Sequence, residues 1–164
     1  MNAPRDSIPE TGAETYLFAS SNGSHITWLT DALSRFGSVV VLAPDTKSVD
    51  ERISLLGPVA VFIDFSSDQS TAASQLHQRL KRDWPALSVL ATGVSAEPAA
   101  MLAALRAGVD DFIDVAASPA DAVNTLRALL ERRNSLQSGT RGCTLTLLGA
   151  RAGLGVTHWR PASR

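Results

Sequence analysis

The chain has 164 residues, of which 45% are hydrophobic and 19% are charged, and its formal net charge is -1. These values suit one globular α/β domain with flanking segments, since a domain usually spans ~100–200 residues. The near-neutral charge argues against a nucleic-acid partner, because neutralising phosphates supplies most of that affinity. A single cysteine, Cys143, excludes an intramolecular disulfide and fits a reducing cytosol.

Residues 1–14 are polar and contain two prolines, so we expect a disordered N-terminal tail rather than a signal peptide. No later run approaches the ~18 apolar residues of a membrane-spanning helix, so we expect no direct membrane insertion. Together these features predict a cytoplasmic protein.

Short apolar runs alternate with helical patterns from residue 15 to residue 133. The runs predict strands at residues 16–19, 39–42, 59–65, 87–91 and 112–115. Apolar residues at helical spacing predict five helices, one after each strand, the last ending at Arg133. Five alternating βα units predict a doubly wound parallel sheet with right-handed crossovers.

The central strand is the unbroken apolar run Val59–Ile63, which leads directly into Asp64. A run that does not alternate is typical of a parallel strand covered on both faces. In an open doubly wound sheet, ligands bind just outside the carboxyl ends of the strands. Asp64 is therefore the candidate site residue.

The order of elements over residues 15–133 resembles the receiver domain of two-component response regulators. On this resemblance Asp64 stands at the phospho-acceptor position, Thr92 at the hydroxyl switch position and Phe112 at the switch aromatic. The run Leu-Arg-Ala-Gly-Val-Asp-Asp-Phe, residues 105–112, is close to the most recognisable run of that family. The resemblance implies a five-stranded flavodoxin-like sheet with strand order 2-1-3-4-5.

Two departures from the receiver pattern argue against phosphotransfer. Receivers hold Mg²⁺ with adjacent carboxylates after the first strand, where this chain has Ser20, Ser21 and Asn22. Receivers place Lys-Pro after the fifth strand, where this chain has Val115 and Ala116. Because phosphoryl transfer depends on metal and cation to stabilise charge, we interpret the domain as a degenerate receiver without a metal.

Polar residues 134–141 read as a linker, and residues 143–148 as a further strand before a glycine-rich loop. This arrangement resembles the TadZ/CpaE pilus-assembly proteins, which join an atypical receiver to a ParA/MinD-type ATPase domain. On that resemblance Arg151 replaces the signature lysine and Val156 the phosphate-contacting lysine, while three residues match the loop: Gly153, Gly155 and Thr157.

Residues 142–164 are therefore expected to be the incomplete, disordered start of a P-loop ATPase domain, with an incomplete ATP site. The expected helix after the loop would be broken by Pro161, which points to a truncated, frame-shifted or added end.

The helix predicted at residues 98–107 has two faces. Met101, Leu102 and Leu105 form one stripe, which we expect to face the sheet. The opposite stripe is made of alanines, which let another helix approach closely, and receivers often pair through this side. We therefore predict a homodimer interface at four residues: Ala100, Ala103, Ala104 and Ala107.

Other candidate residues have ordinary interpretations. The three histidines, His25, His77 and His158, share no ligand spacing and are expected at surface or half-buried positions. Cys143 fits a small hydrophobic residue of a strand better than a nucleophile. Asp110 and Asp111 precede the fifth strand, at the end of the sheet away from Asp64, and predict a solvated turn.

The leading hypothesis is a non-enzymatic receiver-like module for protein–protein interaction and localisation in Flp/Tad pilus assembly. Its expected partners are a second copy and pilus-assembly or polar proteins, and it needs no cofactor. One alternative is a signalling receiver phosphorylated on Asp64 by a histidine kinase with Mg²⁺. A third is a nucleotide-binding fragment.

Overall fold

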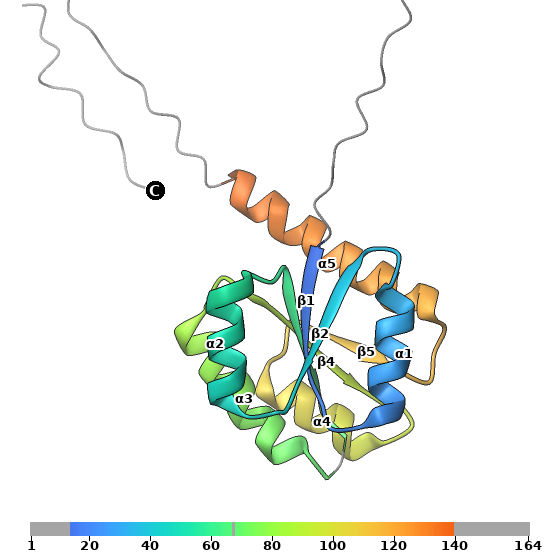
Figure 1. Ribbon diagram of the computed structural model, residues 1–164. Coiled ribbons are helices and arrows are strands. Elements are labelled where there is room, and N and C mark those ends of the chain that lie inside the picture. The colour runs from blue at the N-terminus through green and yellow to red at the C-terminus, as the bar shows by residue number, and fades with distance from the viewer. Residues whose placement is uncertain (1–13, 67, 140–164) are drawn as a thin grey trace, which may run out of the picture.

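Five parallel strands form one open sheet with the order β2-β1-β3-β4-β5 (Figure 1). The computed structural model describes residues 14–66 and 68–139. The strands are β1 (Glu14–Ala19), β2 (Gly37–Leu42), β3 (Ala60–Asp64), β4 (Ser88–Gly93) and β5 (Asp111–Asp114). The helices are α1 (Gly23–Leu33), α2 (Thr46–Leu56), α3 (Ser70–Asp83), α4 (Pro98–Ala107) and α5 (Pro119–Gly139). Both the predicted fold class and the predicted strand order are confirmed.

Helices cover both faces of the sheet and divide its core in two. On one face, α2 and α3 contribute Val49, Ile53, Leu76 and Leu80, and α4 contributes Ala104. On the other face, α1 and α5 contribute a second set of apolar side chains: Leu29, Leu33, Ala122, Leu126 and Leu129. Each helix therefore buries one stripe against the sheet and leaves the other in solvent.

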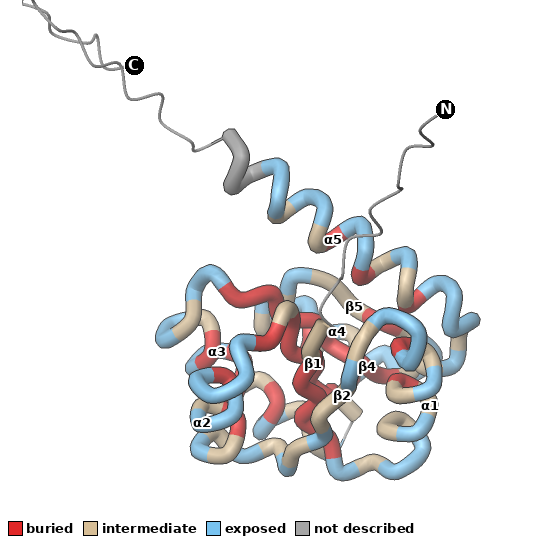
Figure 2. Tube along the Cα trace, turned by 45° about the horizontal axis from the view of Figure 1, so that its top comes forward, coloured by how far each residue is buried: buried red, intermediate tan, exposed pale blue. Residues whose placement is uncertain are grey.

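The central strands are buried along their whole length, as their unbroken apolar runs predict. Every residue of β3 and of β4 is buried, whereas the edge strands β2 and β5 keep partly exposed residues (Figure 2). Asp64 ends β3 and pairs with Thr92 of β4 in the sheet register. A carboxylate and a hydroxyl are thus placed side by side at the buried end of the sheet.

Local signals explain where the helices begin and end. The side chain of Asn22 accepts hydrogen bonds from the Ser24 and His25 N–H groups and begins α1. Asp45 begins α2 in the same way, and the N–H groups of Ser48 and Lys47 hold the pKa of its carboxyl below the ordinary value. Gly57 ends α2 with φ of 54°, a left-handed conformation that favours glycine.

The predicted orientation of α4 is wrong. Ala100 and Ala104 are buried, with at most 1% of their surface exposed, whereas Leu102 and Leu105 are 45% and 67% exposed. The small side chains let α4 approach the sheet closely: the Ala100 Cβ lies 3.8 Å from where a Cβ on Gly93 would be. Ala100 and Ala104 therefore cannot form the predicted dimer interface.

The other two alanines of the predicted interface, Ala103 and Ala107, are half-buried and pack against the core on the α3 side. The apolar side chains that α4 leaves in solvent are leucines. A self-association surface on α4 would therefore have to use the face opposite to the predicted one.

Helix α5 continues through Gly139 rather than ending at Arg133, so residues 134–139 of the expected linker are helical. Arg132 bonds Asp111 at 3.0 Å and Arg133 donates to Ser88 at 3.0 Å, and these contacts hold the helix against the starts of β4 and β5. Within the described ranges, no helix is both long and apolar enough to cross a membrane.

Candidate functional site

The candidate site lies at the carboxyl edge of the sheet, where Asp64 ends the central strand. Asp64 is fully buried, although a carboxylate is among the side chains least often found inside proteins. Phe65, the next residue, stays tied to the sheet because its N–H donates to the Thr92 carbonyl at 2.8 Å. The carboxylate is therefore rigidly held below the surface and needs partners to offset its lost hydration.

Both oxygens of the Asp64 carboxylate are occupied by neighbouring side chains and backbone. Oδ2 accepts from the Ser20 hydroxyl at 2.6 Å and contacts Nδ1 of His25 at 3.0 Å. Oδ1 accepts from the N–H and the hydroxyl of Ser66, at 2.9 and 2.5 Å. Because a carboxylate oxygen only accepts, Nδ1 of His25 carries the proton in this contact. We call Ser20, His25, Asp64 and Ser66 the Asp64 cluster.

The start of α1 brings His25 and Ser20 to this carboxylate. Ser20 follows β1, which pairs directly with β3, and its Oγ also accepts from the Asn22 N–H at 3.0 Å. Asn22 caps the helix, so His25 falls in its first turn, above the end of β3. The helix N-terminus also carries partial positive charge, which favours an anion nearby. Three segments of the chain are thereby joined through one carboxylate.

Thr92 on β4 and Phe112 on β5 make no described hydrogen bond to the Asp64 carboxylate. Thr92 is fully buried, and its hydroxyl donates to the Ile63 carbonyl at 3.4 Å rather than to Asp64. Phe112 is half-buried against the α3–α4 core, with its ring 3.3 Å from where a Cβ on Gly93 would be. Thr92 thus stands directly opposite Asp64 in the sheet, whereas Phe112 stands opposite Ala91, one register position earlier.

A negative charge stands near the end of β5, where receivers have a lysine. Asp114, the last residue of the strand, accepts from both the hydroxyl and the N–H of Ser95 and from the Ala116 N–H. Desolvation alone would raise the pKa of the Asp114 carboxyl, but these hydrogen bonds hold it below its ordinary value. Residues 115 and 116 carry no charge, so this strand end offers no cation to a phosphoryl group.

The residues at this edge do not fit a Mg²⁺ ion. Mg²⁺ favours octahedral oxygen ligands, usually including carboxylates with free lone pairs. Asp64 brings the only carboxylate of its cluster, and its oxygens are engaged by Ser20, His25 and Ser66. In the described part of the chain, no three acidic, histidine or cysteine residues gather closely enough to hold a metal. The arrangement is chemically suited to fixing structure rather than to transferring a group.

The remaining sequence-predicted residues fall in several places. Asp110 pairs with Lys81 at 2.7 Å and Asp111 with Arg132, so the pair is neutralised by cations rather than free in a turn. The prediction for His77 is wrong: it is 2% exposed, because it lies on the sheet-facing stripe of α3. The residues of the glycine-rich loop, Arg151, Gly153, Gly155 and Thr157, lie outside the described ranges, as do Cys143 and His158.

Sequence reasoning missed the partners of Asp64. In the sequence, Ser20 stands where receivers have a carboxylate, and His25 shares no metal-ligand spacing with the other histidines, so neither residue is marked as a partner of Asp64. The positions of Ser20 and His25 in the fold could have indicated these contacts. Because β1 lies beside β3, residues after β1 and in the first turn of α1 must face the end of β3. Ser66 could have been found as the residue two positions after Asp64 in the same loop.

Known structures share this fold. A CheY-like TadZ protein from Pseudomonas aeruginosa is 24% identical, with a TM-score of 0.65 over 71% of this chain and 98% of that one. A putative pilus assembly-related protein from Burkholderia pseudomallei is 22% identical, with a TM-score of 0.60 over 74% and 92%. NtrX from Brucella abortus, solved with ATP, is 21% identical, with a TM-score of 0.67 over 85% of this chain and 32% of that one.

At these identities the structural likeness shows the fold alone, and a comparison with curated proteins finds no match. The family described as pilus assembly protein TadZ N-terminal, in contrast, matches residues 14–141, which is most of the chain. The chain therefore belongs to the TadZ N-terminal family of pilus assembly proteins.

Proposed function

We propose that this domain is a non-enzymatic receiver-like module that acts in pilus assembly by binding other proteins and localising them. The observation that supports the proposal is the Asp64 cluster, in which Ser20, His25 and Ser66 engage both oxygens of the buried carboxylate. A phosphoryl group on Asp64 would have to displace Ser20, His25 or Ser66 and would meet no described metal site. With transfer disfavoured, we assign the role of the domain to its surface, because function depends on particular sites rather than on the fold.

The surface that fits this role is the exposed apolar face of α4. Leu102 and Leu105 are among the large apolar side chains that the described residues expose to solvent, and they lie one turn apart on the same helix. Met101 is half-buried beside them. Clustered exposed apolar side chains are typical of interaction sites. We propose that this face, rather than the alanine face, pairs with a second copy of the chain.

Light scattering on the purified protein tests the interface. Leu102→Glu together with Leu105→Glu should turn a dimer into a monomer, because the pairing would bury four like charges. Leu55→Glu is the matched control, since Leu55 is 72% exposed on α2 and should leave the dimer unchanged. A monomeric wild-type protein, or a dimer that survives the double substitution, would refute pairing through α4.

The alternative function is a phosphorylatable receiver. It draws support from the placement of Asp64, which ends the central strand beside Thr92. Phosphorylation would require the Asp64 cluster to open so that the carboxylate reaches solvent and a metal. Uptake of a phosphoryl group by Asp64, tested at the end of the Discussion, separates this alternative from the proposed role.

A further inference from the structure

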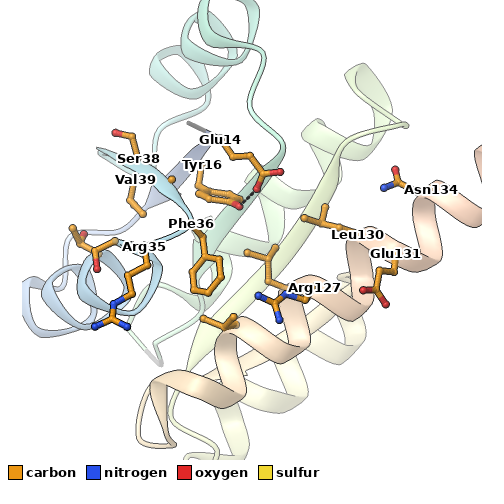
Figure 3. A pocket seen from close by; sticks show the side chains of 15 residues that line it. Glu14, Tyr16, Arg35, Phe36, Ser38, Val39, Arg127, Leu130, Glu131 and Asn134 are labelled. Carbon is orange, nitrogen blue, oxygen red and sulfur yellow. Dashed lines mark hydrogen bonds between the residues drawn. The ribbon is translucent and has the colours of Figure 1, made fainter. Parts of the chain in front are cut away.

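A groove of about 930 Å³ lies between the end of α1, the start of β2 and helix α5 (Figure 3). Helix α1 contributes Thr30, the following turn contributes Ser34, Arg35 and Phe36, and α5 lines the groove from Val123 to Asn134. At 1.5 Å per residue, that stretch of α5 is roughly 16 Å long. The groove is therefore elongated.

The groove exists because two neighbouring helices differ in length. Helices α1 and α5 pack side by side on the same face of the sheet and run in the same direction, since each follows a parallel strand. Helix α1 has 11 residues, whereas α5 has 21. Among the elements that the structure describes, no helix lies beside the second half of α5 on the β2 side, and a partner's helix would complete the layer there.

The walls of the groove combine apolar side chains with charged ones. Val39, Val123 and Leu130 are half-buried, and Phe36 is 37% exposed. The Arg127 guanidinium lies over the Phe36 ring, 5.3 Å from its centroid. Apolar side chains with exposed edges, one of them under a cation, form a surface on which an apolar stripe can be buried.

The charges are ordered along the groove. Among the described residues, Arg35 and Arg127 have no carboxylate partner and Glu131 has no cation partner. Glu131 lies one turn after Arg127 on α5. In Figure 3 the two guanidinium groups lie on either side of Phe36, so they suit separate carboxylates better than one compact anion. The other lining acid, Glu14, already accepts the Tyr16 hydroxyl.

We propose that this α1–α5 groove binds an amphipathic helix of a partner protein. The acidic first turn of the partner helix meets Arg35 and Arg127, its apolar stripe covers Phe36, Val39 and Leu130, and basic residues in its second turn meet Glu131, which lies only about 6 Å beyond Arg127 along α5. Helices commonly carry acidic residues at the N-terminus and basic residues at the C-terminus, so the charge order of the groove selects a partner helix that runs parallel to α5. This surface lies on the opposite face of the sheet from α4 and does not depend on the proposed dimer.

The test uses two fluorescein-labelled helical peptides of 14 residues and identical composition. The forward peptide has an apolar stripe at positions i, i+3, i+7 and i+10, glutamates in its first turn and lysines in its second, which matches the one-turn spacing of Arg127 and Glu131. The reversed peptide exchanges the glutamates and lysines. Fluorescence anisotropy with the full chain should show about tenfold tighter binding of the forward peptide, since several exposed charge pairs change sign together. Amide shifts should fall on Phe36, Gly37 and Arg127.

Exchanging the charges of the groove provides the decisive comparison. The variant Arg127→Glu/Glu131→Lys should prefer the reversed peptide, while Arg106→Glu on the opposite face of the sheet, on α4, should change neither affinity. Substituting Leu102→Glu/Leu105→Glu should also leave peptide binding unchanged, which separates this result from the test of the dimer. If the exchanged variant does not fold, Arg127→Gln takes its place, and it should weaken the binding of the forward peptide but not that of the reversed peptide.

The proposal is overturned if neither peptide binds saturably, if both bind equally, or if the exchanged variant keeps the wild-type preference. It is also overturned if the groove has another occupant. Groove amide shifts on removal of residues 1–13 would assign it to the chain's own N-terminus. A dimer dissociated by Arg127→Glu would assign it to a second copy.

Discussion

Replacing Asp64 by alanine should destabilise the domain. The substitution removes the acceptor for the hydroxyls of Ser20 and Ser66, for the Ser66 N–H and for His25. Ser20 is 3% exposed and cannot regain water, whereas Ser66 and His25 are partly exposed and can. In a site built from several adjacent carboxylates, replacing one aspartate is expected to stabilise the domain instead, because it relieves repulsion between like charges.

The expected loss is about 2–4 kcal/mol. Hydrogen bonds to a charged group contribute about 1.5–3 kcal/mol each to stability. The alanine variant also avoids the cost of burying a carboxylate, and this gain offsets part of the lost hydrogen-bond energy. Asp64→Asn keeps the shape and one acceptor oxygen, so it should cost less, about 1–2 kcal/mol. A double-mutant cycle with His25→Ala should give a coupling of at least about 0.5 kcal/mol, as expected for residues in contact.

Urea unfolding measures these changes. Trp28 and Trp84 pack against the two different cores, so their fluorescence reports both halves of the domain. If the free energy of unfolding falls with urea concentration at the same slope in wild type and variant, the substitution has changed stability alone. An Asp64→Ala protein as stable as the wild type, or more stable, would refute the view that the Asp64 cluster fixes structure.

Two further predictions concern other buried positions. Burial and the positive charge of Lys81 lower the pKa of His77 below its ordinary 6.5, so the unfolded chain takes up a proton at a pH where the folded one does not. Stability should therefore be lost as pH falls from 6.5 through the lowered pKa, and His77→Leu should gain stability over wild type in urea unfolding at pH 5 more than at pH 8. An equal difference at both pH values would contradict this. A Cβ added by Gly37→Ala would clash with the Glu14 carbonyl, 2.8 Å from its carbon, and should cost about 1–3 kcal/mol in the same assay. Gly23→Ala, where a Cβ meets nothing within 4 Å, is the control and should cost less than Gly37→Ala.

Much of the fold could be predicted from sequence because local and global signals agree. The unbroken apolar run at β3 and the glycines at 57 and 108 set strands and helix ends within a few residues of their positions. Sequence reasoning assigns the wrong face of α4 to the core because it uses apolar size as the mark of burial. There the small side chains of Ala100 and Ala104 are the ones that pack against the sheet, and only the tertiary structure shows that.

The candidate site was only half predictable. The place of Asp64 follows from the rule that sites lie at the carboxyl ends of parallel strands. Its partners come from three segments, so their contact depends on which strands are neighbours and on where α1 begins. The α1–α5 groove was not predictable at all, since it results from the unequal lengths of two helices that are far apart in sequence.

Phosphoryl uptake by Asp64 is the most direct test of the account. The protein is incubated with millimolar Mg²⁺ and acetyl phosphate or beryllofluoride, and intact mass and amide shifts near Asp64 and Thr92 are recorded. The account predicts an unchanged mass and no saturable shifts, because Ser20, His25 and Ser66 already occupy the carboxylate. Addition of one phosphoryl group, or saturable shifts abolished by Asp64→Asn, would contradict it and establish a signalling receiver.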